Sequence, residues 1–274
     1  MNTPQNTKAE TFKALHERTG LFVIPNPWDA GSAKMLAGLG FEALATTSAG
    51  LAYALGRPDG SVSRDEALEN SRAIVEATSL PVAADLENGY GDSPEACAET
   101  ILLAAKVGLS GCSIEDATGN EKDPIYAFEY ALERIKAAVK AAQSLPAPFI
   151  LTARAENFLH GRADLKDTIR RLEAYADAGA DVLYAPGLST LAEVDAVVKA
   201  VSPKPVNVLL SVNNPDFTLD GLAKLGVRRV SVGSLLARVA YGAFYTAAQE
   251  LQQKGSFGFV DTAIGYDKLN KMFK

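Results

Sequence analysis

The chain has 274 residues, 47% of them hydrophobic, and a formal net charge of -6 at pH 7. Its length suits one large α/β domain, and its apolar content is enough for a sizeable core. The acidic charge disfavours nucleic acid or an anionic membrane as a bulk partner. Residues 1–10 are polar and no apolar run is long enough to span a bilayer, so we expect a cytoplasmic protein without a signal peptide.

Eight short apolar runs alternate with longer helical segments along the chain. Nearly continuous apolar runs are typical of strands buried on both faces of a parallel sheet. A capping box at Ser63 predicts a helix over 64–77, and Ser93 followed by proline predicts one over 95–107. Eight such repeats, without a Rossmann glycine fingerprint after the first run, favour a closed (β/α)8 TIM barrel over an open sheet. The expected strands are 21–25, 43–47, 81–86, 111–115, 149–154, 181–185, 205–210 and 229–232.

The last segment, residues 255–274, follows the eighth expected helix and is rich in apolar side chains. We therefore expect a single barrel domain over 1–274, with 255–274 as a C-terminal extension. Apolar side chains beyond a completed barrel must be covered. They can pack back on the barrel or on a neighbouring subunit.

Acidic residues collect where the expected strands end, the face that carries catalytic groups in such barrels. Asp85 and Glu87 close the third strand, Glu115 and Asp116 close the fourth, and Asp59 lies in the loop after the second. Alternation along a strand points Asp85 and Glu87 to the same side. Crowded carboxylates need a cation, and oxygen ligands without clustered His or Cys favour Mg2+ or Mn2+ over zinc. Helix capping or loop solvation is the alternative, which we favour only for Asp116.

Three further features lie at the same expected face. Arg154 closes the fifth strand, where its guanidinium needs an anion: Glu115, Glu156 or a substrate. The small-residue loop 47–51 offers backbone N–H groups to a carboxylate, although such a loop alone is a weak indication. His160 follows the fifth strand and is a candidate proton donor, with a solvated loop histidine as an equal alternative.

Five other residues have simpler expected roles. Tyr184 and Asn207 end the sixth and seventh strands and are candidate pocket residues, with core packing favoured for Tyr184. His16 is expected on the surface of an N-terminal helix. Cys97 and Cys112 are expected to be buried, reduced thiols.

With these residues in view, the chain resembles the isocitrate lyase/phosphoenolpyruvate mutase superfamily over most of its length. The resemblance is carried by Pro-Asn-Pro-Trp-Asp at 25–29, Thr-Ser-Ala-Gly-Leu at 47–51, Gly-Arg-Pro-Asp at 56–59, Ala-Asp-Leu-Glu-Asn-Gly-Tyr-Gly at 84–91, Gly-Cys-Ser-Ile-Glu-Asp at 111–116 and Thr-Ala-Arg at 152–154. It implies Mg2+-dependent chemistry at C3 of a small 2-oxo acid, through an enolate that Mg2+ and arginine stabilise. It also implies a homo-oligomer, usually a tetramer, in which a C-terminal helix crosses to a neighbour.

The resemblance assigns expected roles residue by residue. Asp85 would ligate Mg2+ directly, and the other carboxylates would hold its waters or complete its shell. Backbone after the second strand would bind the substrate C1 carboxylate, and Arg154 would contact the carboxylate or the 2-oxygen. The candidate metal-site residues are Asp85, Asp59, Glu87 and Glu115. The candidate substrate-binding residues are Ser48, Ala49, Gly50, Arg154 and Asn207, and the candidate catalytic residues are Arg154, Glu115 and His160.

Departures from the superfamily pattern narrow the expected reaction. The segment 117–126 lacks the Lys-Lys-Cys-Gly-His loop of the isocitrate and methylisocitrate lyases, which disfavours those cleavages. The end of the sixth strand, 183–187, lacks both the lyase glutamate and the phosphonate mutase histidine, although Asn120 offers a polar group to phosphonate chemistry. We therefore expect a Mg2+-dependent lyase, decarboxylase-like or retro-aldol, on an oxaloacetate-like acid. The alternatives are phosphonopyruvate hydrolysis or mutase chemistry, and a non-catalytic 2-oxo acid binder.

Overall fold

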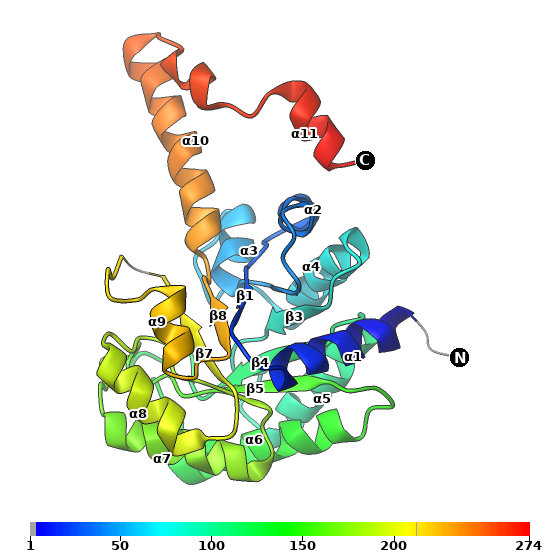
Figure 1. The fold of residues 1–274 in the computed structure, drawn as a ribbon, viewed down its shortest axis with the longest axis vertical. Coiled ribbons are helices and arrows are strands. Elements are labelled where there is room, and N and C mark those ends of the chain that lie inside the picture. Colours follow the sequence, from blue (N-terminus) through cyan, green and yellow to red (C-terminus); the bar gives the residue numbers. More distant parts are fainter. Residues whose placement is uncertain (1–3, 212) are drawn as a thin grey trace.

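In the computed structural model, which describes residues 4–211 and 213–274, eight parallel strands form one sheet in the order β1-β8-β7-β6-β5-β4-β3-β2. A backbone hydrogen bond of 3.1 Å from Ala45 N to Pro25 O joins the two ends of that order, so the sheet curls into a nearly closed barrel (Figure 1). This confirms all eight expected strands and the barrel architecture. The strands are β1 (Phe22–Ile24), β2 (Leu44–Ala45), β3 (Val82–Asp85), β4 (Gly111–Glu115), β5 (Ile150–Arg154), β6 (Val182–Tyr184), β7 (Val206–Leu209) and β8 (Arg229–Ser231).

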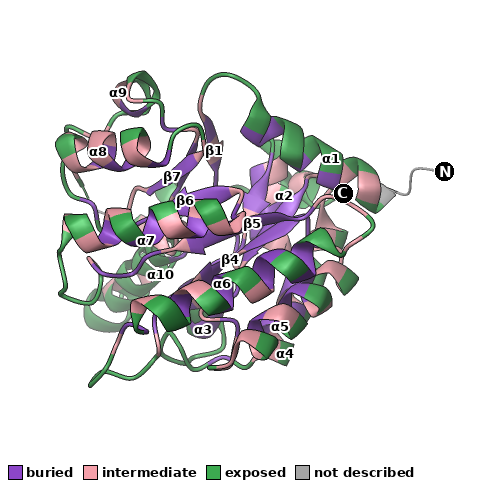
Figure 2. Cartoon of the chain, turned by 90° about the horizontal axis from the view of Figure 1, so that it is seen from below, coloured by how far each residue is buried: buried purple, intermediate pink, exposed green. Residues whose placement is uncertain are grey.

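Helices cover the outside of the barrel, and the colours in Figure 2 show buried residues on the sides that face it and exposed residues on the outer sides. The Ser63 capping box begins α4 as expected, because Ser63 and Glu66 satisfy each other's backbone N–H groups. The helices around the barrel are α2 (Ala30–Gly38), α3 (Ser48–Ala54), α4 (Arg64–Ala77), α5 (Pro94–Lys106), α6 (Phe128–Gln143), α7 (Leu165–Ala178), α8 (Leu191–Val201) and α9 (Leu219–Lys224).

Helix α1 (Pro4–Glu17) packs at the N-terminal end of the barrel, where Phe12 and Leu15 join a buried cluster with Phe22. His16 is buried as well, so the prediction that it lies on the surface is wrong. Its Nδ1 lies 2.8 Å from the Phe12 carbonyl and its Nε2 lies 3.2 Å from Arg229 Nη1. Because a carbonyl only accepts and a guanidinium only donates, His16 is the neutral Nδ1–H tautomer.

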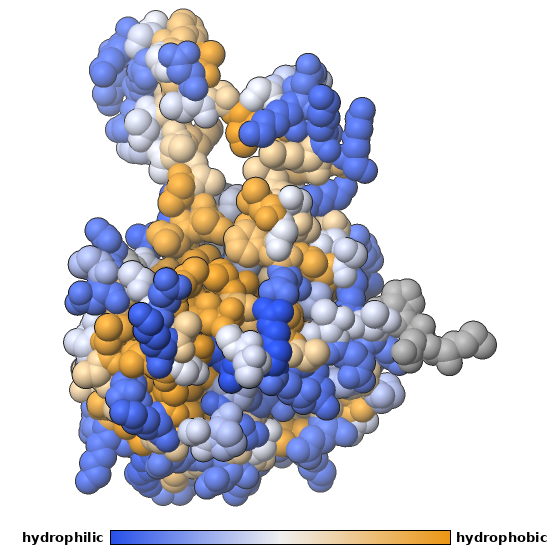
Figure 3. Space-filling view, viewed as in Figure 1, coloured by the Kyte–Doolittle hydropathy of each residue, from blue (hydrophilic) through white to orange (hydrophobic). Residues whose placement is uncertain are grey.

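The chain ends in an arm made of α10 (Leu235–Lys254), a 3-10 turn η1 (Gly258–Thr262) and α11 (Tyr266–Met272). Figure 1 shows α10 projecting from the barrel and α11 returning beside α2. Lys34 Nζ donates to the Phe273 carbonyl at 3.1 Å. Apolar side chains on this arm are exposed, and Figure 3 shows an apolar surface at the root of α10 and open space between α10 and α11. No helix among residues 4–211 and 213–274 is long and apolar enough to cross a membrane.

Candidate functional site

A cavity of about 280 Å³ opens at the carboxyl ends of the strands and reaches into the barrel. It lies where barrel enzymes place their active sites. The residues predicted from the sequence that line it are Ser48, Ala49, Asp59, Asp85, Arg154, Tyr184 and Asn207.

Arg154, at the end of β5, connects three carboxylates. Its Nη1 lies 2.9 Å from Asp85, its Nη2 lies 3.1 Å from Glu115, and its Nε lies 2.9 Å from Glu156. The side chain is only 12% exposed, so this positive charge is costly without such partners. The two protein partners expected from the sequence, Glu115 and Glu156, are both present, and Asp85 is a third. The guanidinium also lies over the Tyr184 ring, 5.0 Å from its centroid.

Asp85 is fixed by groups from neighbouring strands and helices. Its Oδ1 accepts from Arg154, and its Oδ2 accepts from the Ser48 hydroxyl at 3.1 Å. Its backbone N–H donates to the Thr46 hydroxyl at the end of β2. The carboxylate is therefore held at the cavity wall in one orientation, as a metal ligand requires.

Glu87 is the strained member of the cluster. Its backbone has a φ of 47°, a left-handed conformation that is uncommon for a non-glycine residue. Its Oε1 is buried without a hydrogen-bond partner in the described residues. Burial, followed by the charges of Asp85 and Asp59, raises the pKa of Glu87 to about 7. A carboxyl group held against like charges, with an orphaned oxygen, suits a site that takes a cation.

Asp59 contributes to the same electrostatic environment from an otherwise exposed loop. Partial burial and then the Asp85 charge raise the pKa of its carboxyl, whereas a hydrogen bond with Ser48 lowers it. Asp59, Asp85 and Glu87 therefore lie close enough to interact, as expected.

The donor set fits a hard divalent cation that keeps part of its water shell. In the described ranges, no three acidic, imidazole or thiol groups form a closed set of metal ligands. Mg2+ commonly binds through one or two carboxylates and retains several waters. Asp85 would hold such an ion directly, and the orphaned oxygen of Glu87 would accept from one of its waters.

The predicted loop at 48–50 is the first turn of α3. Thr47 caps this helix by accepting from Gly50 N at 3.2 Å. A side chain on Gly50 would meet Thr47 at 2.6 Å and Trp28 at 3.0 Å, so glycine permits close packing here rather than lining the cavity. Ser48 and Ala49 do line it.

His160 and Asn207 occupy different surroundings. His160 lies in the loop after β5, with Nε2 4.0 Å from Glu156, and does not line the cavity. Asn207 is buried in β7 and lines it. Its Oδ1 accepts from Arg229 at 2.8 Å, and its Nδ2 donates to Ser231 at 2.9 Å.

Asp116 is a structural residue, so the favoured role in helix capping or loop solvation is wrong. It is buried, pairs with Arg171 at 3.0 Å, and accepts from the Tyr175 hydroxyl at 2.8 Å. The following bridge between Ala117 and Ile125 draws this segment inward rather than into solvent. The helix α7 residues that bind Asp116 are 55 and 59 positions away, beyond the reach of local sequence rules.

Arg229 and Ser231 of β8 line the cavity and were not singled out from the sequence. An arginine within an apolar strand is the indication that could have identified Arg229, as it identified Arg154. The cysteine expectation is confirmed, because Cys97 and Cys112 are buried and unpaired.

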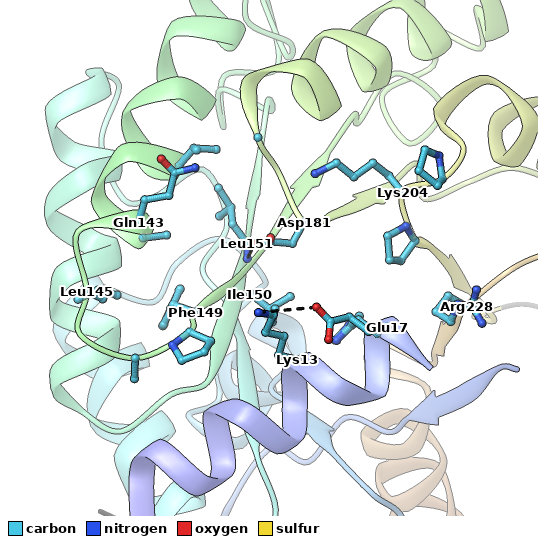
Figure 4. A pocket seen from close by; sticks show the side chains of 18 of the residues that line it. Lys13, Glu17, Gln143, Leu145, Phe149, Ile150, Leu151, Asp181, Lys204 and Arg228 are labelled. Atoms are coloured by element: carbon cyan, nitrogen blue, oxygen red, sulfur yellow. Dashed lines mark hydrogen bonds and ion pairs between the residues drawn. The ribbon is translucent and has the colours of Figure 1, made fainter. Parts of the chain in front are cut away.

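A larger cavity of about 650 Å³ lies at the opposite end of the barrel, beside α1 (Figure 4). Its charged groups are already engaged. Lys13 lies 3.7 Å from Glu17, Lys204 donates to the Ala180 carbonyl, and Asp181 accepts from Leu151 N. This cavity therefore offers no cluster of free polar groups comparable to the one around Asp85.

Comparison with known proteins places the chain in a family. The family model described as phosphoenolpyruvate phosphomutase matches residues 12–252. A Burkholderia cenocepacia J2315 structure, described only provisionally as a lyase/mutase, is 56% identical with a TM-score of 0.97, over 99% of this chain and 98% of that chain. An uncharacterised Mycobacterium tuberculosis protein is 35% identical over 82% of both chains.

More distant relatives have named activities. Oxaloacetate acetylhydrolase in complex with its product oxalate is 28% identical, with a TM-score of 0.88, over 98% of this chain and 94% of that chain. The oxaloacetate decarboxylase of Pseudomonas paraeruginosa is 28% identical over 87% of this chain and 83% of its own. Phosphonopyruvate hydrolase in complex with oxalate and Mg2+ has a TM-score of 0.86 over 97% of this chain and 94% of that chain; at 24% identity this likeness supports the fold.

Proposed function

Because the chain belongs to the phosphoenolpyruvate mutase/isocitrate lyase superfamily, we propose that it is a Mg2+-dependent lyase that breaks a carbon–carbon bond at C3 of a small 2-oxo acid of the oxaloacetate type. The observation that carries the proposal is the group of carboxylates around Asp85 and Arg154 at the mouth of the barrel. A 2-oxo acid offers a carboxylate and a ketone oxygen, which suit a cation and a guanidinium placed side by side.

The residues of the site have three kinds of task in this proposal: holding the ion, contacting the 2-oxo end of the substrate and binding its C1 carboxylate. Asp85 would hold Mg2+, and Asp59, Glu87 and Glu115 would bind its waters. When bound, the ion supplies Lewis-acid stabilisation of the negative charge that develops on the enolate oxygen. Arg154, fixed by its carboxylates, contacts the 2-oxo end of the substrate. The first N–H groups of α3, at Ser48 and Ala49, bind the C1 carboxylate.

The relatives support carbon–carbon cleavage of an oxaloacetate-like acid. Two of them, each 28% identical, carry oxaloacetate in their names, one as a decarboxylase and one as an acetylhydrolase. The strand that ends at Tyr184 continues with Ala185 and Pro186, which provide no imidazole to a phosphonate. We therefore rank carbon–carbon chemistry above phosphorus–carbon chemistry.

A turnover screen with Mg2+ tests the proposal. The substrates are oxaloacetate, C3-substituted malates and phosphonopyruvate, each compared with Mg2+ in the absence of protein. Faster pyruvate formation from oxaloacetate, or cleavage of a substituted malate, supports it. Phosphate release from phosphonopyruvate alone would assign phosphorus–carbon chemistry instead. Tight oxalate binding without turnover of any substrate would identify a binding protein.

We also propose that the chain forms a homo-oligomer through its C-terminal arm. In α10 the one described residue that is buried is Ala237, although the helix carries exposed Val239, Phe244 and Tyr245. Such a surface is costly to leave in water. A neighbouring copy that packs between α10 and α11 would cover it.

A further inference from the structure

The cavity wall contains one phenolic hydroxyl that has no part in the metal cluster. Tyr184, at the end of β6, lines the cavity and is buried. Its strand neighbours in register are Arg154 of β5 and Asn207 of β7. The aliphatic hydroxyls of Ser48, Ser113 and Thr152 also line the cavity, but an alcohol is a much weaker acid than a phenol.

The donor and the acceptor can be assigned in each hydrogen bond of the chain that leads from Arg229 through Asn207 to Ser231. Arg229 can only donate, so the Asn207 amide must turn its oxygen toward Arg229 Nε, 2.8 Å away. The Asn207 nitrogen then donates to the Ser231 hydroxyl at 2.9 Å. Ser231 accepts that bond and is left with its own proton to give.

The Tyr184 hydroxyl lies within hydrogen-bonding reach of Ser231, whose own hydroxyl already accepts from Asn207. Burial raises the pKa of Tyr184, whereas the Arg154 charge and the hydrogen bond with Ser231 lower it. The phenol therefore carries its proton at neutral pH, and it does so on the wall of the cavity.

We propose that Tyr184 is the proton donor to C3 of the enolate, with Ser231, Asn207 and Arg229 as positioning residues; this inference rests on the function proposed above. In decarboxylation the bond between C3 and the leaving carboxyl group breaks, and its electron pair forms the enolate as CO2 departs. The Tyr184 hydroxyl then gives its proton to C3. The resulting phenolate faces Arg154 and regains a proton from water, which restores the enzyme.

The geometry favours Tyr184 over the other candidates. His160 does not line the cavity and lies near Glu156 on the loop side of β5. Cys112 lines the cavity but is only 1% exposed, less than Tyr184 at 7%. Arg154 and Tyr184 are paired residues on adjacent strands, so a substrate held by Arg154 lies beside the phenol.

The test uses 3-methyloxaloacetate in D2O with the full-length protein and Mg2+. Protonation at C3 then gives a chiral 3-deuterio-2-oxobutanoate, which is trapped by reduction and analysed for configuration. A positioned donor gives one enantiomer, and we expect Tyr184→Phe to give a ratio near 1:1. Oxalate affinity should change less than about twofold, because phenylalanine keeps the ring beneath Arg154. Ser231→Ala should lower the enantiomeric ratio partly, since the phenol can then rotate.

Tyr130→Phe on exposed α6 is the matched control and should retain the wild-type ratio. If Tyr184→Phe retains a single enantiomer while wild type is active, Tyr184 is not the donor. Loss of stereochemistry in His160→Asn, with Tyr184→Phe unaffected, would assign the role to His160 and overturn the inference. A wild-type protein that is inactive on oxaloacetate and on its 3-methyl derivative would refute the proposed decarboxylation itself, and this inference with it.

Discussion

Asp85 interacts with both the hydroxyl and the guanidinium that define the site. Ser48 and Arg154 each occupy one of its oxygens, so the carboxylate is oriented before any ligand arrives. Such pre-organisation reduces the cost of binding a metal. The carboxylates around Asp85 also repel one another: burial and then the charge of Asp85 raise the pKa values of Glu87 and Asp59.

We expect Asp85→Ala to abolish Mg2+-dependent turnover, by more than about 100-fold, because it removes the direct ligand. The fold should survive, since Arg154 keeps Glu115 and Glu156 as partners. Turnover measured against Mg2+ concentration, together with circular dichroism, tests both parts. Exposed Glu121→Gln is the control. Wild-type activity in Asp85→Ala would refute the metal assignment.

Arg154→Ala should weaken oxalate binding strongly and also destabilise the protein. Glu156 is only 3% exposed, and removing its partner leaves a buried charge, a loss of about 3–5 kcal/mol in comparable pairs. Calorimetric titration with oxalate and thermal unfolding measure the two effects. Arg154→Lys keeps the charge but not the fork of donors, so it should recover stability more than affinity. Oxalate affinity equal to that of wild type in Arg154→Ala would exclude its role in anion binding.

At the level of single residues, part of the site could be predicted from the sequence. Asp85 and Arg154 could be predicted because they end apolar strands, where a buried charge costs free energy unless it is paired or binds a ligand. His16 and Asp116 could not be predicted, because their burial depends on distant parts of the chain: Arg229 of β8 contacts His16, and Tyr175 of α7 binds Asp116. The tight contact at Gly50 was likewise invisible, since glycine in a small-residue loop resembles a binding loop.

Among the elements, α1 covers the N-terminal end of the barrel, and its His16 makes a hydrogen bond with the buried Arg229 of β8. The strand and helix pattern was predictable from eight local repeats, whereas this long-range contact between residues 16 and 229 was not. The same applies to α3, where Thr47 provides a helix cap in a segment that reads as a loop.

We expect His16 of α1 to make the free energy of unfolding depend on pH. Burial, followed by the Arg229 charge, lowers the pKa of His16 to about 3, from the ordinary value of 6.5. Below pH 6.5, His16 is therefore protonated in the unfolded chain, whereas in the folded chain it stays neutral until the pH falls to about 3. Stability is fully present above pH 6.5 and is lost as the pH falls toward 3.

When the pH falls from 7 to 5, the titration of His16 alone should lower the free energy of unfolding by about 2 kcal/mol. Urea unfolding at both pH values measures the loss. His16→Gln retains a polar side chain without a proton to titrate, so its loss over this interval should be smaller by that amount. An equal loss in both proteins would show that His16 does not titrate in this way.

The molecule as a whole combines a nearly closed barrel with an arm that the barrel does not cover. Sequence alone identified residues 255–274 as apolar and surplus to the barrel, but left open which surface they cover. The structure narrows the choice of surface, because Phe257, Val260 and Tyr266 remain more than half exposed although α11 contacts α2. Intramolecular packing therefore leaves the larger part of the apolar arm in water.

A chain that ends at Lys254 should consequently form smaller particles than the full chain. Light scattering after size-exclusion chromatography gives the mass, which we expect to be a multiple of 28.9 kDa for the full chain. Phe244→Asp should act in the same direction, because it places a charge on a residue that is 71% exposed but apolar. Leu102→Ser, at an exposed residue of α5 away from the arm, is the matched control and should leave the mass unchanged. A full chain that is already monomeric would refute the proposed homo-oligomer.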